Sequence, residues 1–108
     1  MKNIKKSQKL YNRAKKLIPG GNMLLSKKPE LFLPNGWPAY FSKTKGCEIW
    51  DLDYNKFFDL SLMGVGTNIL GYSNDKVDKA VYKIIKTGNL STLNCKEEVI
   101  LAEKLIKI

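Results

Sequence analysis

The spacing of the apolar residues changes twice along this 108-residue chain, and this restricts the fold more than any other feature of the sequence. In residues 3–17 apolar side chains recur at helical spacing, and the Pro-Gly-Gly at 19–21 ends that pattern. From residue 39 the period is two, and AYFSK, CEIWDLD and KFFDLSL predict three strands joined by turns at 44–46 and 53–55. Helical spacing then returns. We therefore predict an α+β fold with an N-terminal helix, a three-stranded antiparallel meander and two following helices.

These elements divide the chain into five expected segments: a basic helix (1–18), a pocket loop (19–38), a β-meander (39–62), a glycine-rich loop (63–74) and two helices (75–108). Asn74 is expected to cap the first of the last two helices, and Gly88 to end it. The final helix is expected to start at Asn94, with Glu97 in a capping-box position and Glu98 also near the cap. Its apolar stripe is expected to be buried and comprises Val99, Ala102, Leu105 and Ile106.

Two features predict that part of the packing partner lies outside the chain. Residues 22–33 are too apolar for a solvated linker, yet Pro29 and Pro34 disfavour a helix or a central strand there. The last apolar stripe reaches the end of the sequence without a glycine, proline or polar stop. We therefore expect the N-terminal piece of a longer protein.

The residue types present exclude several kinds of catalytic site. The chain has no histidine, which rules out Ser/His or Cys/His nucleophile pairs and imidazole metal ligands within it. Cys47 and Cys95 are too few and too far apart for a zinc site or a disulfide framework. No apolar run approaches the roughly 20 residues of a membrane helix, and the basic N-terminus lacks the apolar core of a secretory signal. We therefore expect a cytoplasmic protein.

Positive charge is concentrated at the start of the chain. Residues 1–28 contain nine Lys or Arg and no acid, whereas the other 80 residues contain ten of each sign. Such a segment could bind nucleic acid, and a small basic nucleic-acid-binding module is the alternative function that the sequence leaves open. Eight of the nine cations are lysines and few aromatic residues lie among them. We therefore favour a solvated lysine-rich helix face.

The remaining conspicuous side chains are given structural roles. Trp50 and Phe57 are expected in the core of the meander. Asp51, Asp53 and Asp59 could form an acidic cluster for metal binding or acid–base catalysis, but turn and strand-end carboxylates are more often structural or solvated.

Four motifs in order, LIPGGN, KGCEIWDLDYNKFFDLS, NILGYSNDKVDKAV and EEVILAEKL, resemble the N-terminal portion of the class III pyridoxal-phosphate-dependent aminotransferases. The chain is most similar to the subgroup of glutamate-1-semialdehyde aminomutase, and the resemblance spans residues 7–106. It implies a fold type I enzyme that is a homodimer at full length. It also implies a pyridoxal 5'-phosphate cofactor bound by a later large domain, because the Schiff-base lysine and the phosphate loop of the family come after this segment. We therefore expect no catalytic, cofactor-binding or metal-binding residue here, and a fragment that is inactive by itself.

The resemblance also implies which loops approach a small amino or carbonyl substrate. In the family these are the loop at Pro-Gly-Gly and the glycine-rich loop after the meander, where glycine permits close approach of the backbone. The substrate-binding residues implied here are Gly21, Asn22, Ser26, Lys27, Gly64, Val65, Gly66, Thr67 and Asn68.

Departures from the family pattern leave the substrate open. Tyr54 replaces the usual hairpin glycine, and Tyr72-Ser73-Asn74 stands where Gly-His-x-His-Pro is common. Lys27 and Val65 are nearest to an arginine and a tryptophan of the aminomutase. A different amino donor or a keto-sugar acceptor is therefore as compatible with the sequence as glutamate semialdehyde, and the choice between aminotransferase and aminomutase stays open.

Overall fold

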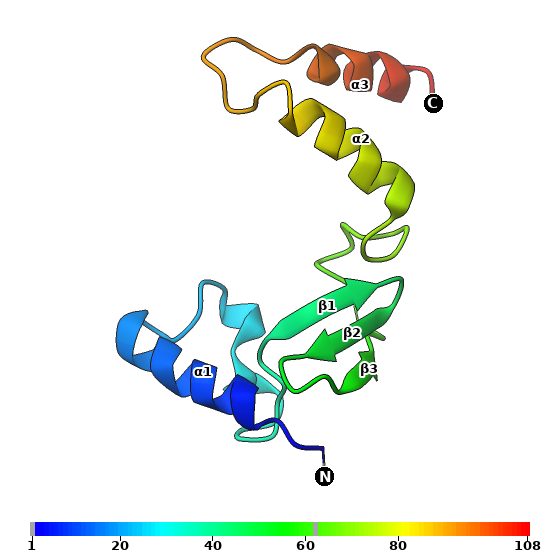
Figure 1. The fold of residues 1–108 in the computed structure, drawn as a ribbon. Helices are drawn as coiled ribbons and strands as arrows, with labels where there is room; N and C mark the ends of the chain where they lie inside the picture. Colours follow the sequence, from blue (N-terminus) through cyan, green and yellow to red (C-terminus); the bar gives the residue numbers. More distant parts are fainter. Residues whose placement is uncertain (1, 62) are drawn as a thin grey trace. The chain divides into compact units, whose positions relative to one another are not determined.

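The computed structural model describes residues 2–61 and 63–108, so the first residue of the predicted helix and the last of the predicted meander, Leu62, lie outside the described residues. The chain divides into two compact units, one up to Asn74 and one from Asp75. The first contains α1 (Lys5–Leu17), the 3-10 turns η1 (Leu25–Lys27) and η2 (Pro29–Leu31), and strands β1 (Phe41–Lys45), β2 (Glu48–Asp51) and β3 (Lys56–Phe58). The second contains α2 (Asp75–Ile85) and α3 (Lys96–Ile106). The α+β prediction is therefore confirmed (Figure 1).

Residues from outside α1 satisfy the first backbone donors of that helix. Its N-cap, Ile4, has no side-chain acceptor, and the first turn contains no acid. The Lys5 N–H instead donates to Asn3 Oδ1 at 3.1 Å, and the Lys6 N–H donates to Asp53 Oδ2 at 2.9 Å. Asp53 lies in the β2–β3 turn, so a carboxylate from the sheet occupies the positive end of the α1 dipole.

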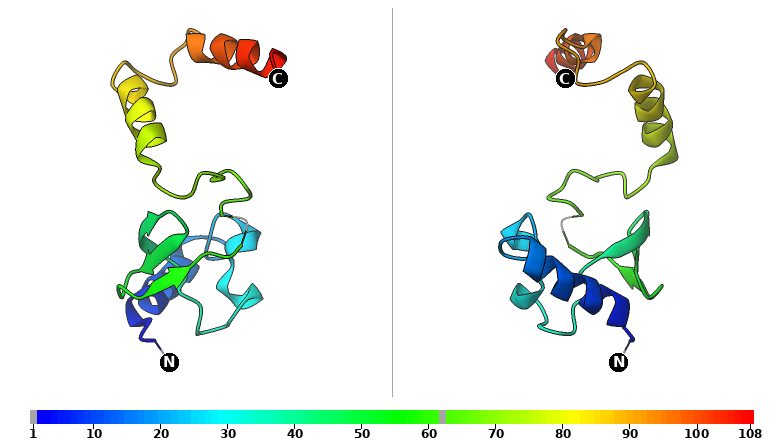
Figure 2. Two further views of the ribbon diagram at one scale, coloured as in Figure 1. Left: turned by 90° about the vertical axis from the view of Figure 1, so that its right-hand side faces the viewer. Right: turned by 60° about the vertical axis from the view of Figure 1, so that its left-hand side comes forward.

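One face of α1 supplies most of the core of the first unit. Ser7, Tyr11 and Ala14 are buried, as their spacing of four and three residues on a helix requires. The chain then reverses through Gly20 and Gly21, both with left-handed φ. A Cβ on Gly21 would lie 3.2 Å from Tyr11 Cε2, so glycine is needed both for the turn and for this contact. In the right-hand view of Figure 2 the light-blue segment that follows α1 turns back and lies beside the helix.

The three strands form an antiparallel sheet in the order β1-β2-β3. The turn predicted at 44–46 is wrong, because Thr44 and Lys45 belong to β1 and pair with β2 residues, and Gly46 alone supplies a left-handed φ at the reversal. The third strand is also shorter than predicted and ends at Phe58. In β1 the register shifts between residues 41 and 43, and the Ser42 hydroxyl donates to the Asp51 carbonyl across this bulge at 2.7 Å.

A buried carboxylate organises the β2–β3 turn. Asp51 is 1% exposed, and its Oδ1 accepts the backbone N–H groups of Asp53 and Asn55 at 2.9 and 2.8 Å. Its Oδ2 accepts Asn55 Nδ2 at 2.8 Å. These bonds hold Tyr54 at φ +63°, a left-handed conformation that glycine adopts more readily than tyrosine.

The aromatic residues of the sheet are only partly buried, contrary to the expectation that Trp50 and Phe57 are core residues. Lys43 Nζ lies 4.9 Å from the centroid of the Trp50 ring, and Lys2 Nζ lies 4.2 Å from that of Phe57. Lysine stems and ammonium groups therefore lie over these rings.

The second unit has no buried residue in either helix. The burial predicted for the last stripe is therefore not found in this chain; Val99 is 60% exposed and Ile106 is 85% exposed. The predicted capping box at Asn94 is also wrong, because the N-cap is Cys95, which makes no side-chain cap bond. This places Glu97 at the second helical position, where its charge still favours the helix dipole but cannot complete the box.

Candidate functional site

A small cavity in the first unit lies between α1, the Pro-Gly-Gly loop and the start of β1. Its volume is about 240 Å³, somewhat below the range typical of sites for drug-sized ligands. It is lined by Tyr11, Asn22, Lys27, Pro29, Ala39, Tyr40 and Phe41. The wall is thus largely aromatic and apolar, with one ammonium group and one amide, which suits a small ligand that carries an anionic or carbonyl oxygen.

The two phenols that line this cavity, those of Tyr11 and Tyr40, both have raised pKa values. The Tyr11 hydroxyl donates to Glu30 Oε2 at 2.7 Å, and this hydrogen bond, with burial, raises the pKa of Tyr11 to about 12. The same bond lowers the pKa of Glu30, and burial raises the pKa of Tyr40. At neutral pH both phenols are therefore protonated, and among the described residues that line the cavity Lys27 is the charged one, while the Glu30 carboxylate lies behind Tyr11.

The structure brings together only part of the predicted substrate-binding set. Asn22 and Lys27 line the cavity, and Gly21 packs against Tyr11 at its edge. The Asn22 Nδ2 donates to the Leu24 carbonyl, which fixes the amide at the cavity wall. Ser26 lies in η1 and is exposed, and it does not line the cavity.

The other five predicted residues, 64–68, form a separate exposed turn. The Thr67 N–H donates to the Gly64 carbonyl at 3.3 Å, and Asn68 Nδ2 donates to the Met63 carbonyl at 3.1 Å. Val65 is 81% exposed at φ +61°, which is an unfavourable conformation for a β-branched residue. None of the hydrogen bonds found within residues 2–61 and 63–108 joins this turn to the cavity.

The aromatic wall of the cavity, which includes Tyr11 and Tyr40, was not predicted from the sequence. Tyr11 is recognisable in the sequence only as one apolar position of a helix, and its acceptor, Glu30, lies 19 residues away beyond an irregular segment. Tyr40 has no local signal that separates it from an ordinary strand residue. Asn22 and Lys27 were expected near a substrate only because the family resemblance places the Pro-Gly-Gly loop there.

The three carboxylates considered as a metal or acid–base cluster have separate structural partners. Asp51 holds the β2–β3 turn, Asp53 caps α1, and Asp59 accepts hydrogen bonds from Ser61 and Tyr72. Among the described residues no group of three or more Cys, Asp or Glu could hold a metal ion. Cys47 and Cys95 are free and exposed. No helix within residues 2–61 and 63–108 is long and apolar enough to cross a membrane.

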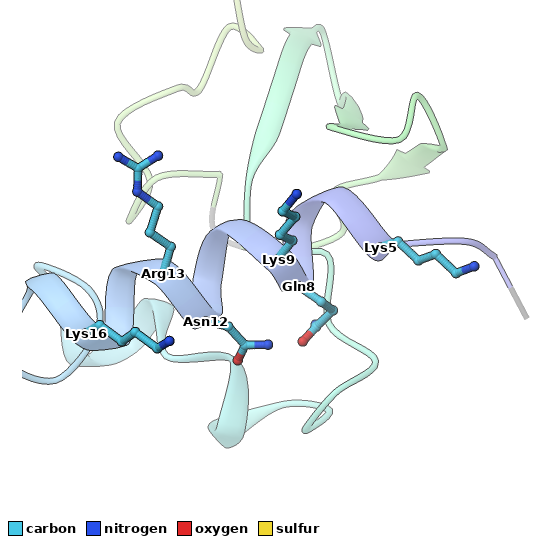
Figure 3. Close-up of a pocket in the computed structure, with 6 residues that line it drawn as sticks. All are labelled: Lys5, Gln8, Lys9, Asn12, Arg13 and Lys16. Atoms are coloured by element: carbon cyan, nitrogen blue, oxygen red, sulfur yellow. The ribbon is translucent and has the colours of Figure 1, made fainter.

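A second hollow lies on the outer side of α1. It is lined by Lys5, Gln8, Lys9, Asn12, Arg13 and Lys16, all from this one helix. Figure 3 shows Lys9 and Arg13 pointing to one side of the helix and Gln8 and Asn12 to the other. Because these side chains diverge, they do not converge on a single small ligand, and the geometry fits the solvated cationic face favoured from the sequence.

Sequence comparison finds relatives over most of this chain, although no protein-family model matches it. It is 38% identical over 104 residues, 96% of the chain, to a glutamate-1-semialdehyde 2,1-aminomutase of Methanothrix thermoacetophila. It is 33% identical over 102 residues to the enzyme of the same name from Methanocaldococcus jannaschii. It is 36% identical over 83 residues, 77% of the chain, to a 3-aminobutyryl-CoA aminotransferase of Cloacimonas acidaminovorans.

Structure comparison agrees with these relatives. The fold matches the FumI protein of Sphingopyxis sp. MTA144, solved in its PLP internal aldimine form, with a TM-score of 0.79 and 31% identity. The match covers 92% of this chain and 23% of FumI. The chain likewise spans 23%, 22% and 20% of the three relatives, in the order in which they are named above, so it corresponds to about a fifth to a quarter of such proteins.

Proposed function

This chain corresponds in sequence and fold to part of a class III pyridoxal-phosphate-dependent aminotransferase, and from that premise we propose that it is the N-terminal part of an enzyme that moves an amino group. The amino group passes between an amino donor and an aldehyde or keto substrate. Both aminotransferases and glutamate-1-semialdehyde aminomutases occur among the relatives, so the proposal covers transfer between two molecules and isomerisation within one.

The role proposed for this segment is to bind and orient the substrate. The observation that carries it is the cavity in which Asn22 and Lys27 meet the Tyr11 and Tyr40 rings. The Lys27 ammonium can bind a carboxylate or carbonyl oxygen, while the aromatic wall excludes water from the carbon chain. We assign residues 64–68 to a second side of the substrate site, on the basis of the family resemblance.

The residues of this chain do not themselves fit the cofactor. A lysine that forms a Schiff base must be held in a desolvated pocket, and none of the lysines in the described ranges is buried. Pyridoxal phosphate, which acts as an electron sink for the carbanion next to the amino nitrogen, would therefore be held by residues beyond those described here. The 108 residues alone should show no saturable binding of pyridoxal phosphate.

We further propose that the complete enzyme is a cytoplasmic homodimer. The free cysteines suit a reducing compartment, and the exposed apolar residues of α2 and α3 suit burial in a larger assembly.

Replacement of Lys27 in the full-length enzyme that contains this segment tests the proposed site. Lys27→Ala should raise KM for the amino or carbonyl substrate by roughly tenfold, the effect of losing one charge-assisted hydrogen bond, with a smaller change in kcat. Lys28→Ala is the matched control, because this neighbouring lysine does not line the cavity. An unchanged KM in Lys27→Ala, or an equal rise in both variants, would show that the cavity does not bind substrate.

A further inference from the structure

The carboxylate of Asp59 contacts both flanks of the glycine-rich segment 63–71. Asp59 directly follows β3, and its Oδ1 accepts the backbone N–H of Ser61 at 2.9 Å and the Ser61 hydroxyl at 2.5 Å. Its other oxygen, Oδ2, accepts the Tyr72 hydroxyl at 2.6 Å. One side chain thus holds the residues that enter and leave the segment.

The exit of the segment is also fixed by the backbone. Tyr72 and Gly46 exchange two N–H···O bonds of 2.8 and 2.9 Å, which attach the exit to the β1–β2 turn. Next to this bridge, a Cβ on Gly71 would lie 3.0 Å from Gly46 Cα, so two glycines allow the close approach. The Asp59 N–H donates to the Cys47 carbonyl at 2.8 Å, so the carboxylate is anchored on the same turn.

The segment between these flanks includes residues whose backbone conformation is unfavourable for their side chains. Met63, Gly64, Val65 and Gly66 have consecutive left-handed φ angles of 41°, 74°, 61° and 77°. Two of the four are not glycine, and such residues keep this conformation only where the surroundings impose it. The hydrogen bonds to Asp59 and Gly46 constrain the two ends of the segment.

We propose that Asp59 is a positioning residue that keeps segment 63–71 in this conformation by holding Ser61 on one side and Tyr72 on the other. Its effect on substrate binding through residues 64–68 rests on the proposed function, whereas its effect on the conformation does not. An ionised carboxylate is needed to accept all three bonds. Although burial raises the pKa of Asp59, the hydrogen bonds from Ser61 and Tyr72 lower it on balance.

Amide hydrogen exchange, followed by NMR on the 108-residue chain, tests this role. In Asp59→Asn the Thr67 and Gly71 amides, which donate within the segment, should exchange on the order of tenfold faster, because the asparagine side chain keeps only one acceptor oxygen and cannot accept the bonds from both Ser61 and Tyr72. The Tyr54 amide, which donates to the Asp51 carbonyl, should be unchanged.

A second variant separates the two flanks. Tyr72→Phe should accelerate exchange at Gly71 but leave the Ser61 amide protected, since that amide is bound to the other carboxylate oxygen. Tyr82→Phe, on exposed α2, is the matched control and should change neither. If Asp59 instead stabilised the first unit as a whole, the substitutions would accelerate amide exchange equally in the sheet and in segment 63–71.

Three results would overturn the proposal: uniform acceleration, unchanged exchange at Thr67 and Gly71 in both variants, or unprotected Thr67 and Gly71 amides in the unmodified chain. Because none of these readouts uses a substrate, failure of the proposed function would leave the test intact. Conversely, if the two variants give the predicted exchange pattern but Lys27→Ala leaves KM unchanged, only the substrate assignment is refuted.

Discussion

At the scale of single residues, hydrogen bonds between acidic and phenolic side chains join segments that lie far apart in the sequence. Tyr11 reaches Glu30 across 19 residues, and Tyr72 reaches Asp59 across 13. Neither pair could be predicted from the sequence, because each depends on a loop whose path has no periodic signal. The burial of Asp51 could not be predicted for a related reason: a carboxylate in a W-D-x-D run resembles an exposed turn residue, yet it is buried because three donors of its own turn converge on it.

The two phenols give a prediction for alkaline pH. Their pKa values are raised to about 12, for Tyr11 mainly by the hydrogen bond to Glu30 and for Tyr72 by burial and then by the hydrogen bond to Asp59. A pKa above the unfolded value of about 10 means that the folded state holds the proton more tightly. This contribution to stability is therefore complete below about pH 10 and is lost as the pH rises toward 12.

A phenolate absorbance titration checks this expectation. Tyr11 and Tyr72 should remain largely protonated near pH 11, and Tyr40, whose pKa is raised by burial, should also titrate late; Tyr11→Phe or Tyr72→Phe should each remove one of the late-titrating groups. Tyr82→Phe should leave these groups in place. Ionisation of all five phenols together near pH 10 would contradict the hydrogen bonds described here.

At the scale of elements, the sequence predicted which elements exist better than where they start and stop. The change of period located α1 and the three strands, because apolar spacing reflects the burial of whole faces. The β1–β2 turn and the start of α3 were misplaced by one or two residues, because single residues such as Gly46 and Cys95 decide those boundaries. The cap that Asp53 provides for α1 could not be predicted, since the two lie 47 residues apart.

Replacement of Asp53 tests that long-range cap. Asp53→Ala removes the acceptor of the Lys6 N–H and the charge at the α1 N-terminus, and should lower the free energy of unfolding by about 0.5–2 kcal/mol. Asp53→Asn keeps an acceptor and should cost less. Urea unfolding of the two variants measures the difference, with Asp78→Ala in the first turn of α2 as the control. Equal stability of Asp53→Ala and the unmodified chain would rule out the cap.

At the scale of the whole molecule, the two units differ in what stabilises them. The first has a small core and many side-chain bonds between its elements, whereas both 11-residue helices of the second lack a buried residue. Isolated helices shorter than about 12–15 residues are marginal in water, because nucleation is costly. Burial of their apolar stripes therefore depends on a covering surface that these residues do not supply to one another.

Hydrogen exchange along the whole chain should show this difference. In dilute solution the amides of 75–106 should have protection factors below about ten, while those of β2 should be protected more strongly. Repeating the measurement at higher protein concentration is the control, because self-association that covers the stripes would raise protection only there. Strong protection of α2 and α3 at every concentration would contradict the prediction.

The positions of the two tryptophans determine what optical spectroscopy can report about this protein. Trp37 stacks on Phe32 with ring centroids 4.5 Å apart, and Trp50 lies beneath two lysines, so both belong to the first unit. Tryptophan fluorescence therefore originates only in the first unit, whereas far-ultraviolet circular dichroism detects α2 and α3 as well as α1. As a result, tryptophan emission would follow the unfolding of the first unit during denaturation, while ellipticity would follow the helices of both units.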